Sequence, residues 1–96
     1  MLMFVVQTME HGGGPDREEL ERLLLGVAAG DQEALAALYR RARTAVYGLA
    51  LSILKNTHDA QDVTQDTFVR IWDSAPQYRA QGSPMAWMLP IARNLA

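Results

Sequence analysis

The sequence contains no cysteine and no long apolar run. Without cysteine, disulfide frameworks and thiolate metal sites are excluded, and the composition fits a reducing compartment. No apolar stretch approaches the roughly 18 residues that a membrane-spanning helix requires. The apolar residues 1–6 are too few for a signal-peptide core, and no basic residue precedes them. We therefore expect a cytoplasmic protein that makes no membrane contact of its own.

The sequence also lacks the alternation of polar and apolar residues that is typical of β-strands. Its apolar residues recur with the period of an α-helix instead, and 49% of the chain is hydrophobic, which is ample for a folded core. A length of 96 residues suits one small domain. We predict an all-α fold, a compact bundle of four helices over residues 16–96. A flexible tail over residues 1–15, ending in three glycines and a proline, is expected to precede it.

Capping residues, glycine and proline predict where these helices begin and end. The first helix is expected to be capped by Asp16, in a capping box with Glu19, and to be stopped by Gly30. Asp31 is expected to cap the second helix, which a turn at 56–58 follows. The third helix is expected to run from its cap at Asp59 to Ala75, and after a loop over 77–82 the fourth begins at Ser83 and Pro84. The apolar stripes of the first two comprise Leu20, Leu23, Leu24 and Val27, then Leu35, Leu38, Ala42, Val46, Leu49 and Ile53.

The net charge is only −2, which by itself argues weakly against nucleic-acid binding. The charges are nevertheless segregated along the chain. Residues 34–58 contain four basic residues and no acid, whereas residues 59–73 contain four aspartates and one arginine. This segregation is expected if different partners contact different faces, and ordinary solvated helix faces would explain it equally well.

The third predicted helix has two contrasting sides. Its apolar side comprises Ala60, Val63, Phe68, Ile71, Trp72 and Ala75, and its polar side comprises Asp62, Gln65, Asp66, Val69 and Asp73. Acids and an amide around one exposed valine suit docking onto a basic helical partner. An ordinary solvated face remains the alternative interpretation.

The loop before the last helix has a composition suited to an unstacked nucleotide base. It comprises Tyr78, Arg79, Ala80, Gln81, Gly82 and Ser83. An aromatic ring can stack on a base, an amide can bond its edge, and a cation can contact its phosphate. A plain connector between two helices is the alternative.

The fourth predicted helix is apolar almost all round. Trp87, Pro90, Arg93 and Asn94 share its less apolar side. Arg93 and Asn94 are candidates for contacts to phosphates and base edges. Trp87 is expected to pack in the core, and Pro90 removes one helical hydrogen bond and is expected to kink the helix.

Three motifs in order resemble the extracytoplasmic-function class of bacterial sigma factors, over about residues 20–96. They are residues 30–35 (GDQEAL), residues 59–72 (DAQDVTQDTFVRIW) and residues 86–96 (AWMLPIARNLA). The middle motif is the most specific, because its acids, glutamine, phenylalanine and tryptophan all stand at the spacing of that family.

The resemblance implies region two of such a factor. That region binds the clamp helices of the largest RNA polymerase subunit and recognises and melts the promoter −10 element, capturing a flipped base of the non-template strand. By position, the polymerase-binding residues would be Asp62, Gln65, Asp66 and Val69. The DNA-binding residues would be Tyr78, Arg79, Ala80, Gln81, Gly82, Ser83, Arg93 and Asn94, with Arg40, Arg41 and Arg43 as further candidates for phosphate contacts.

The chain departs from the family in two ways. Pro90 stands where the family often has a basic or aromatic residue, so a melting contact there is not expected. The sequence also stops within the fourth helix, whereas family members continue into a domain that reads the −35 element. We therefore expect either a truncated piece of such a factor or an isolated domain, and we do not expect it to initiate transcription alone.

Catalysis is not expected. The sequence shows no nucleophile paired with a base, no metal-ligand cluster and no phosphate-binding loop, so neither enzyme activity nor a cofactor is predicted. One alternative is a helical interaction module that an anti-sigma regulator sequesters, and the family makes such a partner plausible. A helix-turn-helix DNA-binder is a second alternative, but the fourth helix is too apolar for a recognition helix.

Overall fold

The computed structural model describes residues 16–80 and 82–96, and all regular structure within them is helical. The elements are α2 (Arg17–Ala28), α3 (Gln32–Leu54), α4 (Thr57–Ser74), the short 3-10 helix η1 (Ala75–Gln77) and α5 (Pro84–Leu95). The prediction of an all-α, four-helix fold is confirmed. The predicted tail over residues 1–15 lies outside the described residues.

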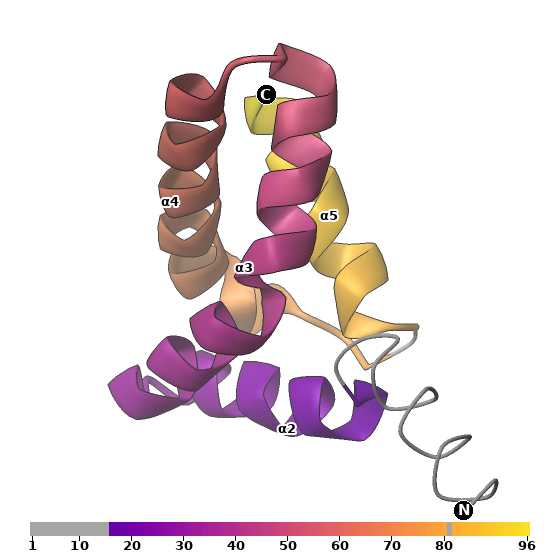
Figure 1. The fold of residues 1–96 in the computed structure, drawn as a ribbon. Coiled ribbons are helices and arrows are strands. Elements are labelled where there is room, and N and C mark those ends of the chain that lie inside the picture. The colour runs from indigo at the N-terminus through magenta and orange to yellow at the C-terminus, as the bar shows by residue number, and fades with distance from the viewer. Residues whose placement is uncertain (1–15, 81) are drawn as a thin grey trace, which may run out of the picture.

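Helix α3 is the central element of the fold. It packs against α2, α4 and α5, and α4 also packs against α5. Figure 1 shows α3 and α4 side by side, joined by a tight turn, while α2 lies across the opposite end of the bundle. The segment that joins η1 to α5 passes close to this crossing helix (Figure 1). Residues of α2 and of the loop are therefore neighbours, although more than fifty positions separate them.

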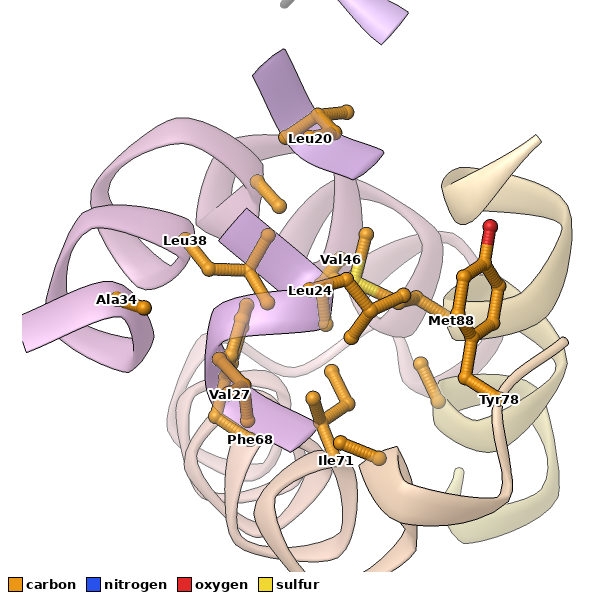
Figure 2. Packing of buried hydrophobic residues seen from close by; sticks show 13 residues of the cluster. Leu20, Leu24, Val27, Ala34, Leu38, Val46, Phe68, Ile71, Tyr78 and Met88 are labelled. Carbon is orange, nitrogen blue, oxygen red and sulfur yellow. The ribbon is translucent and has the colours of Figure 1, made fainter. Parts of the chain in front are cut away.

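One hydrophobic core joins all four α-helices (Figure 2). Its main side chains are Leu20, Leu24 and Val27 of α2, Leu38 and Val46 of α3, Phe68 and Ile71 of α4, and Met88 and Ala92 of α5. The expected stripe of α3 is wrong at its end, because Ile53 is 43% exposed. The buried row follows every fourth residue, through Leu38, Ala42, Val46 and Ala50, so Ala50 takes the core position and Ile53 turns outward.

The turn between α2 and α3 forms as the sequence predicts. Gly30 has a φ of +89°, a left-handed conformation that favours glycine. The Gly30 N–H donates to the carbonyl of Val27, and the Asp31 N–H donates to that of Gly26, the paired bonds of a Schellman motif. The Asp31 side chain then accepts the N–H of Glu33 at 2.9 Å and so caps α3.

The turn between α3 and α4 is tighter than predicted. Lys55 adopts a left-handed φ of 58° and ends α3, and the side chain of Asn56 accepts the N–H of Asp59 at 2.9 Å. The N-cap of α4 is therefore Asn56, and the prediction that Asp59 is the cap is wrong. Asp59 lies in the first turn instead, where a carboxylate is favoured by the positive end of the helix.

Two further predicted N-caps, at the starts of α2 and α5, are confirmed. Asp16 accepts the N–H of Glu18, but the expected capping box is wrong in its second half, because the Glu19 carboxylate bonds Arg41 of α3. Ser83 accepts the N–H of Ala86 at 3.0 Å and starts α5. That helix continues through Pro90.

Candidate functional site

The polar side of α4 presents a continuous exposed row. Asp62, Gln65, Asp66 and Val69 are all exposed, and Val69 is 62% exposed, the most of any large apolar residue in the described parts of the chain. Their spacing of three, one and three residues places them on one helix face over about two turns, roughly 10 Å. The opposite face enters the core through Phe68 and Ile71. The predicted partition of this helix into two sides is therefore confirmed, except that Val63 and Trp72 of the apolar side are only half-buried.

Two threonines of α4 are buried, which the apolar pattern alone does not predict. Thr64 and Thr67 are 5% and 0% exposed. Each hydroxyl donates to the carbonyl four residues earlier, of Ala60 and Val63 respectively, at 2.7 Å. Threonine can satisfy its own hydroxyl within a helix in this way, so it can occupy the buried side at little cost.

A groove between α3 and α4 extends the exposed row with apolar surface. Its volume is about 610 Å³, and its lining includes Leu35 and Tyr39 of α3 and Phe68, Val69 and Trp72 of α4. Gln65 also lines it. The row and the groove therefore form one surface, which we call the α4 face. The α3 contribution was missed from the sequence, because these residues lie about thirty positions before their α4 neighbours.

Arg40, Arg41 and Arg43 of α3, the further candidates for phosphate contacts, have different surroundings. Arg41 donates to Glu19 of α2 at 2.6 Å, so it connects two helices. The Arg43 guanidinium lies 5.8 Å from the centre of the Tyr39 ring, a cation–π contact beside the α4 face. Arg40 is exposed. Of the three, Arg41 is the least available for a phosphate.

Tyr78 of the loop is buried, although the sequence suggested a ring free to stack on a base. Only 6% of it is exposed, and its ring belongs to the core cluster (Figure 2). It meets the ring of Trp87 edge to face, with 5.4 Å between centroids and an interplanar angle of 71°. Its hydroxyl donates to the carboxylate of Glu21 on α2. In this conformation the Tyr78 ring offers no free face on which a base could stack.

Burial, together with the hydrogen bond to Glu21, raises the pKa of the Tyr78 hydroxyl from 10.0 to about 12. Removing a phenol from water disfavours its charged form, and a neighbouring carboxylate disfavours a second negative charge. The hydroxyl therefore stays protonated and remains a donor at any physiological pH.

The exposed part of the loop begins after Tyr78. Arg79, Ala80 and Gly82 are exposed, and Arg79 donates to the carbonyls of Gln77 and Tyr78 at 3.3 Å each. Ser83 is half-buried and its hydroxyl caps α5. Gln81, predicted to bond a base edge, lies outside the described residues. The proposed base contacts of this loop stay a prediction.

The last turn of α5 carries the remaining predicted DNA contacts. Arg93 and Asn94 are both exposed. Trp87 is partly buried against the core, as expected. The ten residues from Ser83 to Arg93 span about 15 Å of helix. The loop and the Arg93–Asn94 pair therefore lie at opposite ends of α5.

Neither a metal centre nor a membrane segment is found in the described residues. Within 16–80 and 82–96, no three histidine or acidic side chains lie close enough together to hold a metal ion. Over the same residues, no helix combines the length and hydrophobicity needed to cross a bilayer.

Comparison with known proteins agrees with the second and third sequence motifs, residues 59–72 and 86–96. The family described as Sigma-70 region 2 matches residues 38–96. The ECF RNA polymerase sigma factor SigK of Mycobacterium sp. (strain KMS) is 42% identical over 79 residues, which are 81% of this chain and 41% of that relative. The protein of the same name from Mycobacterium tuberculosis (strain ATCC 25177 / H37Ra) is 36% identical over 86 residues, 86% of this chain and 46% of the relative.

The chain thus spans less than half the length of these relatives. The family match, by contrast, covers well over half of the chain and includes α4, the loop and α5. The chain belongs to the sigma-70 region 2 family, and its relatives are extracytoplasmic-function sigma factors.

Proposed function

We propose that this domain docks on the clamp helices of RNA polymerase through the α4 face and binds the non-template strand of the promoter −10 element through the loop and α5. The observation that carries the proposal is the exposed row of Asp62, Gln65, Asp66 and Val69 beside an apolar groove. Membership of the sigma-70 region 2 family supports this proposal, since an exposed row of this kind would serve a partner rather than the core. The role is binding, not catalysis.

Docking through the α4 face would combine charge with apolar burial. Asp62 and Asp66 attract a basic helix and set its orientation. Val69 and the groove supply a small apolar centre, which interfaces place inside a polar rim. The Arg43 guanidinium at the margin of the α4 face would favour an acidic or amide group on the partner. A partner would therefore need such a group as well as basic residues.

DNA binding would use the opposite ends of α5. Arg79 and Arg93 are exposed cations, and cation contacts to phosphates give salt-dependent affinity. The loop would hold an extruded base, which offsets the few kcal/mol that unstacking costs. Tyr78 would anchor this loop from inside rather than stack on the base, because its ring is buried. Asn94 would read a base edge one helix length away.

An anti-sigma regulator is a second candidate partner for the α4 face. The exposed Val69 and the apolar groove would suit a protein partner of either kind. If a regulator used this surface, it would compete with polymerase. Sequestration would then be a regulated state of the same domain.

The docking proposal is tested by reversing one charge of the row. Asp66→Arg places a cation against the basic partner, so pull-down of the isolated clamp helices should weaken at least about tenfold. Glu18→Arg makes the same charge change on the exposed side of α2 and should leave binding unchanged. Circular dichroism should show equal helicity for both. Retained pull-down by Asp66→Arg would place the docking surface elsewhere.

The DNA proposal is tested by comparing the two promoter strands. Fluorescence anisotropy should show tighter binding to single-stranded non-template −10 DNA than to the template strand, with clamp helices present and at two salt concentrations. Equal affinity for both strands, or no binding to either, contradicts the proposal.

A further inference from the structure

The exposed loop is held at both of its ends. After it, the Ser83 hydroxyl accepts the Ala86 N–H and fixes the start of α5. Before it, Tyr78 is inserted into the core and bonded to α2. The described loop residues Arg79, Ala80 and Gly82 therefore lie between two fixed points, Tyr78 and Ser83.

The Tyr78 attachment joins the loop to two helices, one of which, α2, is distant in sequence. Its hydroxyl reaches Glu21, 57 positions earlier on α2, and its ring packs on Trp87 of α5. A phenylalanine at this position could make the same ring contact, because that contact needs no hydroxyl. The hydroxyl adds a directional bond to a carboxylate, and hydrogen bonds to charged groups are stronger than neutral ones.

Glu21 has no other partner assigned to it among the described residues. The salt bridges described on α2 belong to Glu19, which contacts Arg22 and Arg41. Glu21 is half-buried on the side of α2 toward the loop and accepts the Tyr78 hydroxyl. A half-buried carboxylate that accepts from a phenol forms a directional link.

We propose that Glu21 and Tyr78 are positioning residues for the loop: their hydrogen bond, braced by Trp87, holds the described loop residues that follow Tyr78, namely Arg79 and Ala80, in position to receive the single-stranded base. This inference rests on the proposed DNA-binding function of the loop. It assigns α2, which contributes no predicted DNA contact, a part in DNA binding. It also gives Tyr78 a role that differs from base stacking.

The physical basis is preorganisation. Ordering one residue of flexible backbone costs about 1–2 kcal/mol, and a loop that is ordered in advance does not lose this energy when it binds. Losing the Glu21–Tyr78 bond would free the first loop residues, Arg79 and Ala80. Affinity for the non-template strand should then fall by about three- to tenfold, while docking on clamp helices should not change.

The test uses four variants of the whole chain. Tyr78→Phe keeps the ring and removes the donor, and Glu21→Ala removes the acceptor. Glu21→Gln keeps an acceptor oxygen and should restore most of the lost affinity. Glu18→Ala, on the exposed side of the same helix, is the matched control. The double variant Tyr78→Phe with Glu21→Ala should bind no more weakly than either single one, because both remove the same bond.

A second readout is independent of DNA. Hydrogen exchange of the backbone amides of residues 79, 80 and 82 should be several-fold faster in Tyr78→Phe and Glu21→Ala than in the wild type and Glu18→Ala. If exchange is faster in these variants but the wild type does not bind DNA, the Glu21–Tyr78 hydrogen bond is confirmed. The proposed DNA-binding function, and with it the positioning role, would then be contradicted. Unchanged exchange, or additive losses of affinity in the double variant, would overturn the inference directly.

Discussion

Tyr78 shows how one side chain can be correctly located in a loop and still have a different environment from the one expected. Its position between two helices indicates an exposed ring suited to a base. The structure buries the ring against Trp87 and directs its hydroxyl at Glu21. An amphipathic residue of this kind can pack its ring and still satisfy its polar end. The residue therefore belongs to the core and to the loop at once.

This burial predicts a pH dependence of stability. The folded-state pKa of Tyr78, about 12, lies above its ordinary value of 10.0, so folding favours the protonated phenol. The stabilisation is complete below pH 10 and is lost as pH rises through 12. In urea unfolding, the stability advantage of the wild type over Tyr78→Phe should shrink between pH 9 and pH 11.5. A constant difference over this range would contradict the assigned environment.

Gly26 is a residue whose role only the packing reveals. A Cβ added there would lie 2.8 Å from the Cβ of Ala34, where α2 crosses α3. Gly26→Ala should gain about 1 kcal/mol of helix propensity but lose about 1–3 kcal/mol to overpacking. We expect net destabilisation in chemical denaturation. Gly48→Ala, in open space on α3, is the control and should stabilise by about 0.5–1 kcal/mol. Stabilisation by both would contradict the close approach.

At the scale of the element, α4 combines a buried side and an exposed side, the proposed docking surface, within eighteen residues. Its hydroxyls on the buried side are satisfied by its own carbonyls, so no described neighbour has to provide a partner for them. No buried side-chain polar atom lacks a hydrogen bond among the described residues. Substitutions in the exposed row should therefore leave the hydrogen bonds of the buried hydroxyls intact.

The start of α4 provides a test that separates the observed cap from the predicted one. Asn56→Ala removes the acceptor for the Asp59 N–H and should destabilise the fold by about 1 kcal/mol. Asp59→Ala removes only a favourable charge at the helix start, about 0.3–1 kcal/mol, and less at high salt. Thermal unfolding in 1 M salt should therefore show a loss for Asn56→Ala and almost none for Asp59→Ala. The reverse order would restore Asp59 as the cap.

At the scale of the whole molecule, the fold separates the two proposed partners. Helices α3 and α4 form the α4 face, while the loop and α5 carry the proposed DNA contacts. α2 crosses the end of the bundle near the loop (Figure 1). A domain with this division could engage polymerase and a DNA strand at the same time, as the proposed function requires.

The salt dependence of DNA binding tests which arginines face the strand. Each phosphate contact to a single strand contributes about 0.7 to the slope of log K against log salt. Arg93→Gln should lower the slope by about that amount, because Arg93 is exposed on α5. Arg41→Gln should leave it nearly unchanged, because Arg41 is paired with Glu19. Anisotropy titrations over a range of salt give both slopes, and equal effects would contradict this assignment.

The local chemistry of the sequence was sufficient for the four helices, for most of their ends and for the exposed row of α4. Helical periodicity, the Gly30 turn and the Ser83–Pro84 start depend on residues within a few positions of one another. Only the tertiary structure decided which neighbours these helices meet. It placed Leu35 and Tyr39 beside Val69, paired Glu19 with Arg41 and closed Glu21 on Tyr78. Such contacts depend on how α2 crosses the bundle and on how closely backbones approach, and no local pattern contains either.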